Sequence, residues 1–258
     1  MSPSLQPLTP QAVGSVRLIA TDMDGTLTQG EKFTPMLLQT LVELAKARLP
    51  VLIVTGRSAG WVDAVAHYLP IWGAIAENGG LFYDQTGKRE LLSVIPDIVQ
   101  HRQQLAQIFE SLQTQFPQIH ESSDNPFRLT DWTFDVAGLS LEDLYQLNAL
   151  CHTQGWGFTY STVQCHIKPL HQEKAIGLQQ VLRCHFPELQ PNQIVTVGDS
   201  PNDQSLFEAS HFPVSVGVAN IRHYAQQMAH LPLYVTQNPE AAGFCELAQA
   251  VLQRYSPR

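Results

Sequence analysis

Three short, largely apolar runs of the chain each lead into a polar residue that can do chemistry. The runs cover residues 16–21, 50–54 and 193–197, and they are followed by Asp22, by Thr55 and, after one glycine, by Asp199. Such runs are typical of strands that are buried on both faces, as in a parallel sheet. Ligands of open α/β sheets bind outside the carboxyl ends of the strands. We therefore expect these three residues to meet at one edge of a parallel sheet.

The pattern between and beyond these runs alternates strands with helices, except in the middle of the chain. Predicted helices cover residues 34–45, 58–68, 173–186, 202–209, 221–228 and 239–255, and further strands cover 71–76, 213–216 and 233–235. The middle reads as strands 81–83, 90–95 and 132–137, helices 98–116 and 140–153, and a hairpin of strands 158–161 and 163–168. Alternation predicts a doubly wound parallel sheet, and the middle predicts an α+β insert. We assign residues 1–83 and 168–258 to an α/β, Rossmann-like core, 84–167 to the insert, and the first 14 residues to a flexible leader.

Charge and composition narrow the classes of partner. The chain has 258 residues, 44% of them hydrophobic, and a formal net charge of -8, so a packed globular protein that repels nucleic acid and anionic lipid is expected. An anionic substrate must then be drawn in by a local cation. Four cysteines without a C-x-x-C spacing indicate reduced thiols, and neither a secretory signal nor a membrane-spanning run of about 20 apolar residues is visible. We expect a cytoplasmic protein, and the sequence leaves its oligomeric state open.

The spacing of Asp22 and Asp24 indicates two carboxylates with different tasks. With one residue between them at a strand end, both can face one pocket around a turn that Gly25 permits. One carboxylate can attack phosphorus while the other handles a proton. The alternative is a surface turn, because Asp-x-Asp-Gly-Thr is also favourable turn chemistry.

Two further segments offer groups that could hold a phosphate. Thr55-Gly56-Arg57 presents a hydroxyl and a backbone N–H at a helix N-terminus, although a capping threonine explains it equally well and Arg57 could be structural. Lys174 precedes a predicted helix. A lone lysine there is commonly a solvated charge, but an acidic site that binds a phosphate dianion needs a fixed cation.

The last segment, residues 198–203, carries two carboxylates and the amide of Asn202 in a loop after a buried strand, which could also be a helix cap. The aspartates of the first and last segments offer oxygen ligands only, which suit Mg²⁺ better than Zn²⁺. The candidate metal ligands are Asp22, Asp24, Asp199 and Asp203.

In this order, the four segments resemble the four motifs of the haloacid dehalogenase (HAD) superfamily of phosphotransferases. The first matches the pattern D-x-D-G-T in full, and the last matches G-D-x-x-N-D. The position of the insert and the turn at residues 77–80 are similar to the Cof-type branch with a large α+β cap. That branch includes sugar phosphatases, sucrose-phosphate phosphatase, mannosyl-3-phosphoglycerate phosphatase and phosphomannomutases. One departure is that Lys174 is followed by Ala175 where the branch often has glycine, and Gly177 comes later.

The resemblance implies roles for the motif residues. Asp22 would form an aspartyl-phosphate, and Asp24 would protonate the leaving group and then activate water. Mg²⁺ would be held by Asp22, the Asp24 carbonyl and Asp199, with Asp203 in support. The implied catalytic residues are Asp22, Asp24, Thr55 and Lys174, and the implied substrate-binding residues are Thr55, Gly56, Arg57, Asn78, Arg128, His166, Lys174 and Asn202.

The insert would close over the core and select the substrate. Its candidate contacts are Arg128, His166 and Lys168, with Asp131 or Gln164 for hydroxyl groups, while His166 could equally be an ordinary half-buried histidine. Lys168 also competes with Lys174 for the lysine of the third motif.

We therefore expect a Mg²⁺-dependent phosphatase that acts on a small phosphorylated metabolite, either a sugar phosphate or a glycosyl-phosphoglycerate. The first alternative is a phosphomutase, which is disfavoured because the cations of the insert are scattered along the sequence. The second is a non-catalytic binding module, which is disfavoured because all four motifs are intact.

Overall fold

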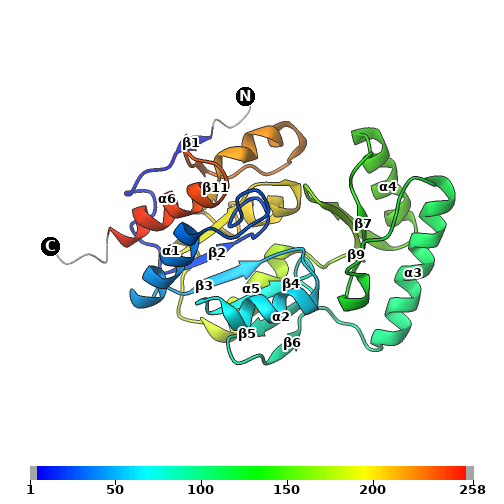
Figure 1. Cartoon of the computed structure of the whole chain (residues 1–258), viewed down its shortest axis with the longest axis horizontal. Coiled ribbons are helices and arrows are strands. Elements are labelled where there is room, and N and C mark those ends of the chain that lie inside the picture. Colours follow the sequence, from blue (N-terminus) through cyan, green and yellow to red (C-terminus); the bar gives the residue numbers. More distant parts are fainter. Residues whose placement is uncertain (1–4, 254–258) are drawn as a thin grey trace.

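A nine-stranded sheet forms the body of the molecule in the computed structural model, which describes residues 5–253 (Figure 1). Its strand order is β1-β12-β11-β10-β2-β3-β4-β5-β6. The strands are β1 (Gln6–Pro7), β2 (Leu18–Thr21), β3 (Val51–Val54), β4 (Gly73–Ala76), β5 (Leu81–Asp84), β6 (Arg89–Leu91), β10 (Ile194–Gly198), β11 (Ser215–Gly217) and β12 (Tyr234–Val235). The pairs from β1 to β4 are parallel, and β5 and β6 add an antiparallel edge.

Helices cover both faces of this sheet, which confirms the doubly wound α/β core. Helices α1 (Pro35–Lys46), α2 (Ala59–Tyr68) and α6 (Glu240–Leu252) share one hydrophobic cluster, and α5 (Lys174–His185) belongs to the cluster on the other face. Side chains of β2 alternate accordingly, since Ile19 joins the first cluster while Leu18 and Ala20 join the second. The apolar runs are therefore strands buried on both sides, as their composition predicts.

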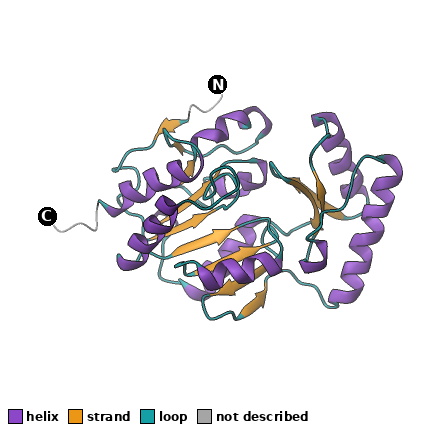
Figure 2. Cartoon of the chain, in the orientation of Figure 1, coloured by secondary structure: helices purple, strands orange, loops and turns teal. Residues whose placement is uncertain are grey.

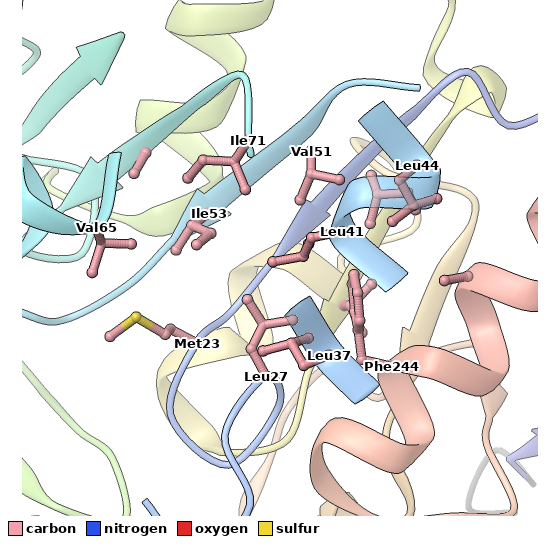
Figure 3. Close-up of a cluster of buried hydrophobic side chains, with 14 of the residues drawn as sticks. Met23, Leu27, Leu37, Leu41, Leu44, Val51, Ile53, Val65, Ile71 and Phe244 are labelled. Carbon is pink, nitrogen blue, oxygen red and sulfur yellow. The ribbon is translucent and has the colours of Figure 1, made fainter. Parts of the chain in front are cut away.

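The first cluster also anchors the loop that carries the aspartate pair. Met23 and Leu27 flank residues 24–26 and are almost fully buried, at 2% and 0% exposure. Figure 3 shows the Leu27 side chain beside Leu37 of α1 and Phe244 of α6, and Met23 between Leu27 and Val65 of α2. The loop at the end of β2 is thus held by hydrophobic packing on both sides of its polar residues.

The insert forms a second layer with its own core. Strands β7 (Trp132–Asp135), β8 (Trp156–Tyr160) and β9 (Gln164–Pro169) make an antiparallel sheet in the order β7-β9-β8. Helices α3 (Ile98–Gln115) and α4 (Leu141–Thr153) pack on the side of this sheet that faces away from the large one (Figure 2). Ser140 and Asp143 form a capping box at the start of α4. This α+β unit is the predicted cap.

Successive residues of β9 point to opposite sides of the cap sheet. Cys165 and Ile167 belong to the apolar cluster under α3 and α4. Gln164, His166 and Lys168 alternate with them, so the period of two places these polar side chains on the side that faces the core. The cap therefore turns a polar face toward the carboxyl ends of the core strands.

Several sequence expectations are corrected. Strand β6 pairs with β5 in the large sheet, so an insert that begins at residue 84 begins too early. The leader is not wholly irregular, because β1 pairs with β12 and Val13 is buried, while residues 1–4 lie outside the described chain. The expected helices 202–209 and 221–228 are short 3₁₀ turns at 201–207, 219–223 and 225–227. The expected end of the last helix at 254–255 also lies outside the described residues.

Within residues 5–253, no helix combines the length and apolar character required to cross a bilayer. The four cysteines are free thiols, and three of them are buried.

Candidate active site

The loop after β2 is a tight turn that presents Asp22 at the sheet edge. The backbone N–H of Asp22 bonds the Val197 carbonyl of β10 at 2.9 Å, and the Met23 carbonyl accepts the N–H of Leu27 at 2.8 Å. Gly25 has φ +78, and a Cβ there would lie 2.5 Å from an Asp199 carboxylate oxygen. Only glycine fits this turn, because both its backbone conformation and its contact with Asp199 exclude a side chain.

Lys174 joins the first and last motifs. Its Nζ lies 2.5 Å from Asp22 Oδ1 and 2.7 Å from Asp203 Oδ1, and the lysine is fully buried. Burial works against its charge, but the Asp203 and Asp22 carboxylates outweigh it and raise the pKa of Lys174. Burial, with added repulsion from Asp203, raises the pKa of Asp22 to about 8 although Lys174 opposes this. The lysine is therefore a fixed ammonium between two carboxylates.

Gly177 explains how α5 brings Lys174 so close to the sheet. A Cβ at Gly177 would lie 2.7 Å from the Cα of Gly79 in the turn after β4, so the helix and the turn are in direct backbone contact. The glycine that often follows the motif lysine is absent here, and Gly177 provides the close approach instead.

Asp199 completes an acidic cluster. It accepts hydrogen bonds from Thr26 Oγ1 at 3.0 Å and from Asn220 Nδ2 at 2.9 Å. Burial, together with repulsion from Asp22 and Asp203, raises the pKa of Asp199 well above its usual value. Oxygen atoms of these three aspartates all lie within 4.8 Å of one another. Three carboxylates around one lysine leave excess negative charge, and this all-oxygen donor set fits a divalent cation such as Mg²⁺.

Asp24 is held by Arg57. The guanidinium binds the carboxylate through two hydrogen bonds, of 2.8 Å from Nε and 2.7 Å from Nη2, and it lies 5.3 Å over the Trp61 ring. The hydrogen bond to Asp24 raises the pKa of Arg57, although burial opposes it. Arg57 therefore fixes the orientation of the second aspartate, in keeping with the bidentate geometry that arginine favours.

The second motif and the turn after β4 supply neutral donors. Thr55 is fully buried, and its hydroxyl accepts the Arg57 N–H at 3.1 Å. Asn78 accepts a hydrogen bond from Asn202 Nδ2 at 3.3 Å, whereas its own Nδ2 is buried and has no partner among residues 5–253. A buried amide without a partner costs free energy, so it is a candidate donor to a phosphoryl oxygen.

A cavity lies between the core and the cap. We call its core side the core wall, which consists of Asp22, Asp24, Thr55, Gly56, Arg57, Ser200 and Asn202. We call its cap side the cap wall, which consists of Ser161, Val163, Gln164 and His166. The structure thus brings the predicted catalytic aspartates opposite His166 and Gln164 of β9.

The cap cations do not line this cavity. Arg128 is buried, and its guanidinium donates to Asp124 and Asp131, to Gln164 Oε1 and to the Gly56 carbonyl at 2.9 Å. The expectation that Arg128 binds substrate is therefore not supported by its position, because its guanidinium N–H groups already donate to protein acceptors.

Lys168 is also occupied. Its Nζ donates to the Gln172 carbonyl at 2.6 Å and to Glu173 Oε1 at 2.8 Å. Of the two competing lysines, Lys174 is the one that contacts Asp22.

Three residues of the site are not among the site residues predicted from the sequence. Asn220 donates to both Asp199 and the Gly25 carbonyl, and Thr26 donates to Asp199. Glu77 is buried and accepts hydrogen bonds from the Ala59 and Thr130 N–H groups at 2.9 and 2.6 Å, so it ties α2 to the cap. Asn220 follows strand β11, and a polar residue close behind a buried run is a signal that could have identified it.

Comparisons with known proteins relate this chain to phosphatases. A family model described as sucrose-6F-phosphate phosphohydrolase matches residues 15–250. A phosphoglycolate phosphatase of Methanothrix thermoacetophila is 28% identical over 238 residues, which cover 90% of this chain and 95% of that protein. One from Pyrobaculum islandicum is 26% identical and covers 92% of this chain and 96% of its own length.

Solved structures share the fold. The Thermoplasma acidophilum protein 0175 has a TM-score of 0.74 at 19% identity and covers 93% of this chain and 98% of its own. The sucrose-phosphatase of Synechocystis sp. PCC6803, solved with sucrose and phosphate, has a TM-score of 0.65 at 19% identity and covers 92% and 97%. At these identities the likeness concerns the fold alone.

Proposed function

Because this chain belongs to the sucrose-6F-phosphate phosphohydrolase family, we propose that Asp22 is the nucleophile of a Mg²⁺-dependent phosphatase. The chain is a phosphoric monoester hydrolase of the HAD superfamily. The observation that carries the proposal is the placement of Asp22, whose carboxylate contacts Lys174 and shares a cluster of oxygen ligands with Asp199 and Asp203.

Residues on the core side of the cavity take different parts in the proposed reaction. Asp22 attacks phosphorus and forms an aspartyl-phosphate, while the Lys174 ammonium offsets the repulsion between the carboxylate and the phosphate dianion. Thr55 and the free Asn78 amide hold phosphoryl oxygens. Asp22, Asp199 and the Asp24 carbonyl would hold a Mg²⁺ ion, which would supply further charge neutralisation.

Asp24 handles the proton. It protonates the leaving alkoxide and then takes a proton from the water that attacks the aspartyl-phosphate, so one group acts first as acid and then as base. Arg57 keeps this carboxylate at the cavity through its two hydrogen bonds. Asp203 acts indirectly, because its oxygens hold Lys174 and the Asp199 N–H.

The substrate is a small phosphorylated metabolite, and we propose a sugar phosphate or a glycosyl-phosphoglycerate. The family description supports a sugar phosphate. Phosphoglycolate is a second candidate, because the curated relatives at 25–28% identity that cover most of this chain are named as phosphoglycolate phosphatases.

A panel of phosphate esters tests the proposal. The purified chain is expected to release inorganic phosphate from p-nitrophenyl phosphate and from one or more metabolites when Mg²⁺ is present, with kcat/KM ranking the substrates. If no ester of the panel releases phosphate, the proposed phosphatase activity is refuted.

The phosphomutase alternative has its own test. A hexose monophosphate with a bisphosphate activator should yield free phosphate and no isomerised sugar phosphate. Isomerisation without phosphate release would establish the mutase instead.

A further inference from the structure

Among the residues that the structure describes, one polar side-chain atom of the cap wall has no hydrogen-bond partner, and it belongs to His166. Val163 is apolar. The Ser161 hydroxyl accepts the Val163 and Gln164 N–H groups at 3.2 Å. Gln164 accepts from Arg128 with Oε1 and donates one of its two Nε2 hydrogens to Asp124. His166 uses Nδ1 for Asp131, and no residue in the described range bonds its Nε2.

Asp131 fixes which nitrogen of His166 carries the proton. Arg128 Nη1 donates to both Asp131 oxygens, at 2.9 and 3.0 Å, and both side chains are fully buried. Burial opposes the charge of Asp131, but Arg128 and His166 outweigh it and lower the pKa of this carboxyl. An anionic carboxylate 2.9 Å from Nδ1 can only accept, so Nδ1 carries the hydrogen and Nε2 of the neutral ring is an acceptor.

Arg128 holds Asp131 and Gln164 in place, so its positive charge is not available to the cap wall. Arg128 is committed to Asp124, Asp131 and Gln164. Burial lowers the pKa of His166, which keeps its ring neutral. A leaving group that reaches this wall therefore meets a lone pair and no positive charge.

We propose that His166 is a specificity-determining residue, which accepts a hydrogen bond from a hydroxyl of the leaving group. This inference rests on the proposed function and narrows it to phosphate esters of neutral, hydroxyl-bearing alcohols. A carboxylate at the same place would set two acceptors against each other and lose its solvation without compensation. Esters such as phosphoglycolate are then poor substrates, although relatives of this chain carry that name.

Three esters of nearly equal size test the proposal directly. Glycerol 3-phosphate carries two hydroxyls, propyl phosphate carries none, and 3-phosphoglycerate keeps one hydroxyl and has a carboxylate in place of the terminal one. We expect kcat/KM to be about tenfold or more higher for glycerol 3-phosphate than for either of the others, the scale of one hydrogen bond. A wild-type preference for 3-phosphoglycerate would overturn the proposal.

Variants of His166 separate recognition from folding. His166→Phe keeps a ring but has no acceptor, so the preference for glycerol 3-phosphate over propyl phosphate should fall by about tenfold. His166→Gln, which keeps an oxygen acceptor, should fall between this variant and the wild type. The matched control is His152→Phe on the exposed side of α4, which should leave the preference unchanged. An equal loss for both esters in both His166 variants would overturn the proposal.

Asp131→Asn probes the tautomer itself. The amide oxygen should stay against Arg128, so that its NH₂ donates to Nδ1 and moves the ring hydrogen to Nε2. The ring then becomes a donor, and the ratio of 3-phosphoglycerate to glycerol 3-phosphate activity should rise, which a merely structural role would not produce. An unchanged or lower ratio would contradict the assignment. No phosphate release from any ester, p-nitrophenyl phosphate included, would instead overturn the proposed function and this role of His166 with it.

Discussion

The core wall and the cap wall of the cavity balance their charges in different ways. On the core side, Lys174 is paired with Asp22 and Asp203, and burial together with repulsion from the neighbouring carboxylates raises the pKa of Asp22 and Asp199. On the cap side, Arg128 is paired with Asp124 and Asp131, and the cavity meets a neutral histidine. An acidic cluster that can hold a cation suits binding and transfer of a phosphoryl group, whereas a wall that presents a neutral side chain suits recognition of an uncharged group.

The two walls also differ in how the chain builds them. Core-wall residues lie in loops at strand ends, where unusual backbone is possible, as in the neighbouring Gly25 with φ +78 and Asn78 with φ +54. Cap-wall residues such as His166 lie on a strand, where register with β7 and β8 fixes the direction of each side chain. The placement of the proposed phosphoryl-transfer residues therefore depends on loop geometry, and the placement of the proposed specificity residue His166 depends on the register of the cap sheet.

The largest expected effect is on the core wall. Asp22→Asn removes the nucleophile while keeping its shape, so phosphate release should fall by more than about 10⁴-fold, the scale seen when a catalytic nucleophile is deleted. Phosphate release with Mg²⁺ measures it. Asp63→Asn, an exposed position on α2, is the matched control. Retained activity in Asp22→Asn would mean that another residue attacks phosphorus.

Asp24→Asn should have a smaller effect that depends on the leaving group. Loss of a general acid costs about 10²–10⁴-fold. The loss should be larger for an alkyl phosphate than for p-nitrophenyl phosphate, whose leaving group needs little protonation. Comparison of kcat for the two esters measures this, and the same loss for both would argue that Asp24 acts only through the turn or through Arg57.

Arg128→Met should affect the cap more than the core. It leaves the buried carboxylates of Asp124 and Asp131 without their cation, which costs about 3–5 kcal/mol. Hydrogen exchange should show lost protection in α3 and α4 with β2 and β3 unchanged. The exposed Arg183→Met serves as control. Uniform loss across both units would show that the two walls are not energetically separate.

Metal binding should give the smallest effect, measured as thermal stability. Mg²⁺ relieves the repulsion in the acidic cluster, so saturation at about 100 times its Kd should add about 2.7 kcal/mol to the free energy of unfolding. Asp199→Asn should raise the Tm without metal, because it removes one buried charge, and should reduce the response to Mg²⁺. A full response in this variant would place the metal elsewhere.

Much of the core wall could be predicted because its signals are local. Asp22, Thr55 and Asp199 each follow a buried run, and the structure brings all three motifs to the same sheet edge. Asn220 was not predicted as a site residue, because no acidic residue directly follows the short apolar run before it. The edge strand β1 escaped because its partners, residues 234–235, lie more than two hundred positions away.

The cap wall was harder to predict because charge pairing is not visible in a list of charges. Arg128 looked like a substrate ligand, yet its partners Asp124 and Asp131 lie four residues before it and three after it in a segment that is mostly irregular. The boundary of the insert was misplaced because the short strand β6 carries little apolar pattern, so only its pairing with β5 assigns it to the core.

The sequence by itself determined the alternation of strands and helices and the residues that stand at the strand ends, since both follow from the order of neighbouring side chains. The tertiary structure alone decided which charges are paired: Lys174 and not Lys168 meets Asp22, across 152 residues, and Arg128 is committed to Asp124 and Asp131. The physical reason is that the free energy of a buried charge depends on every group around it, and those groups come together only when the chain has folded.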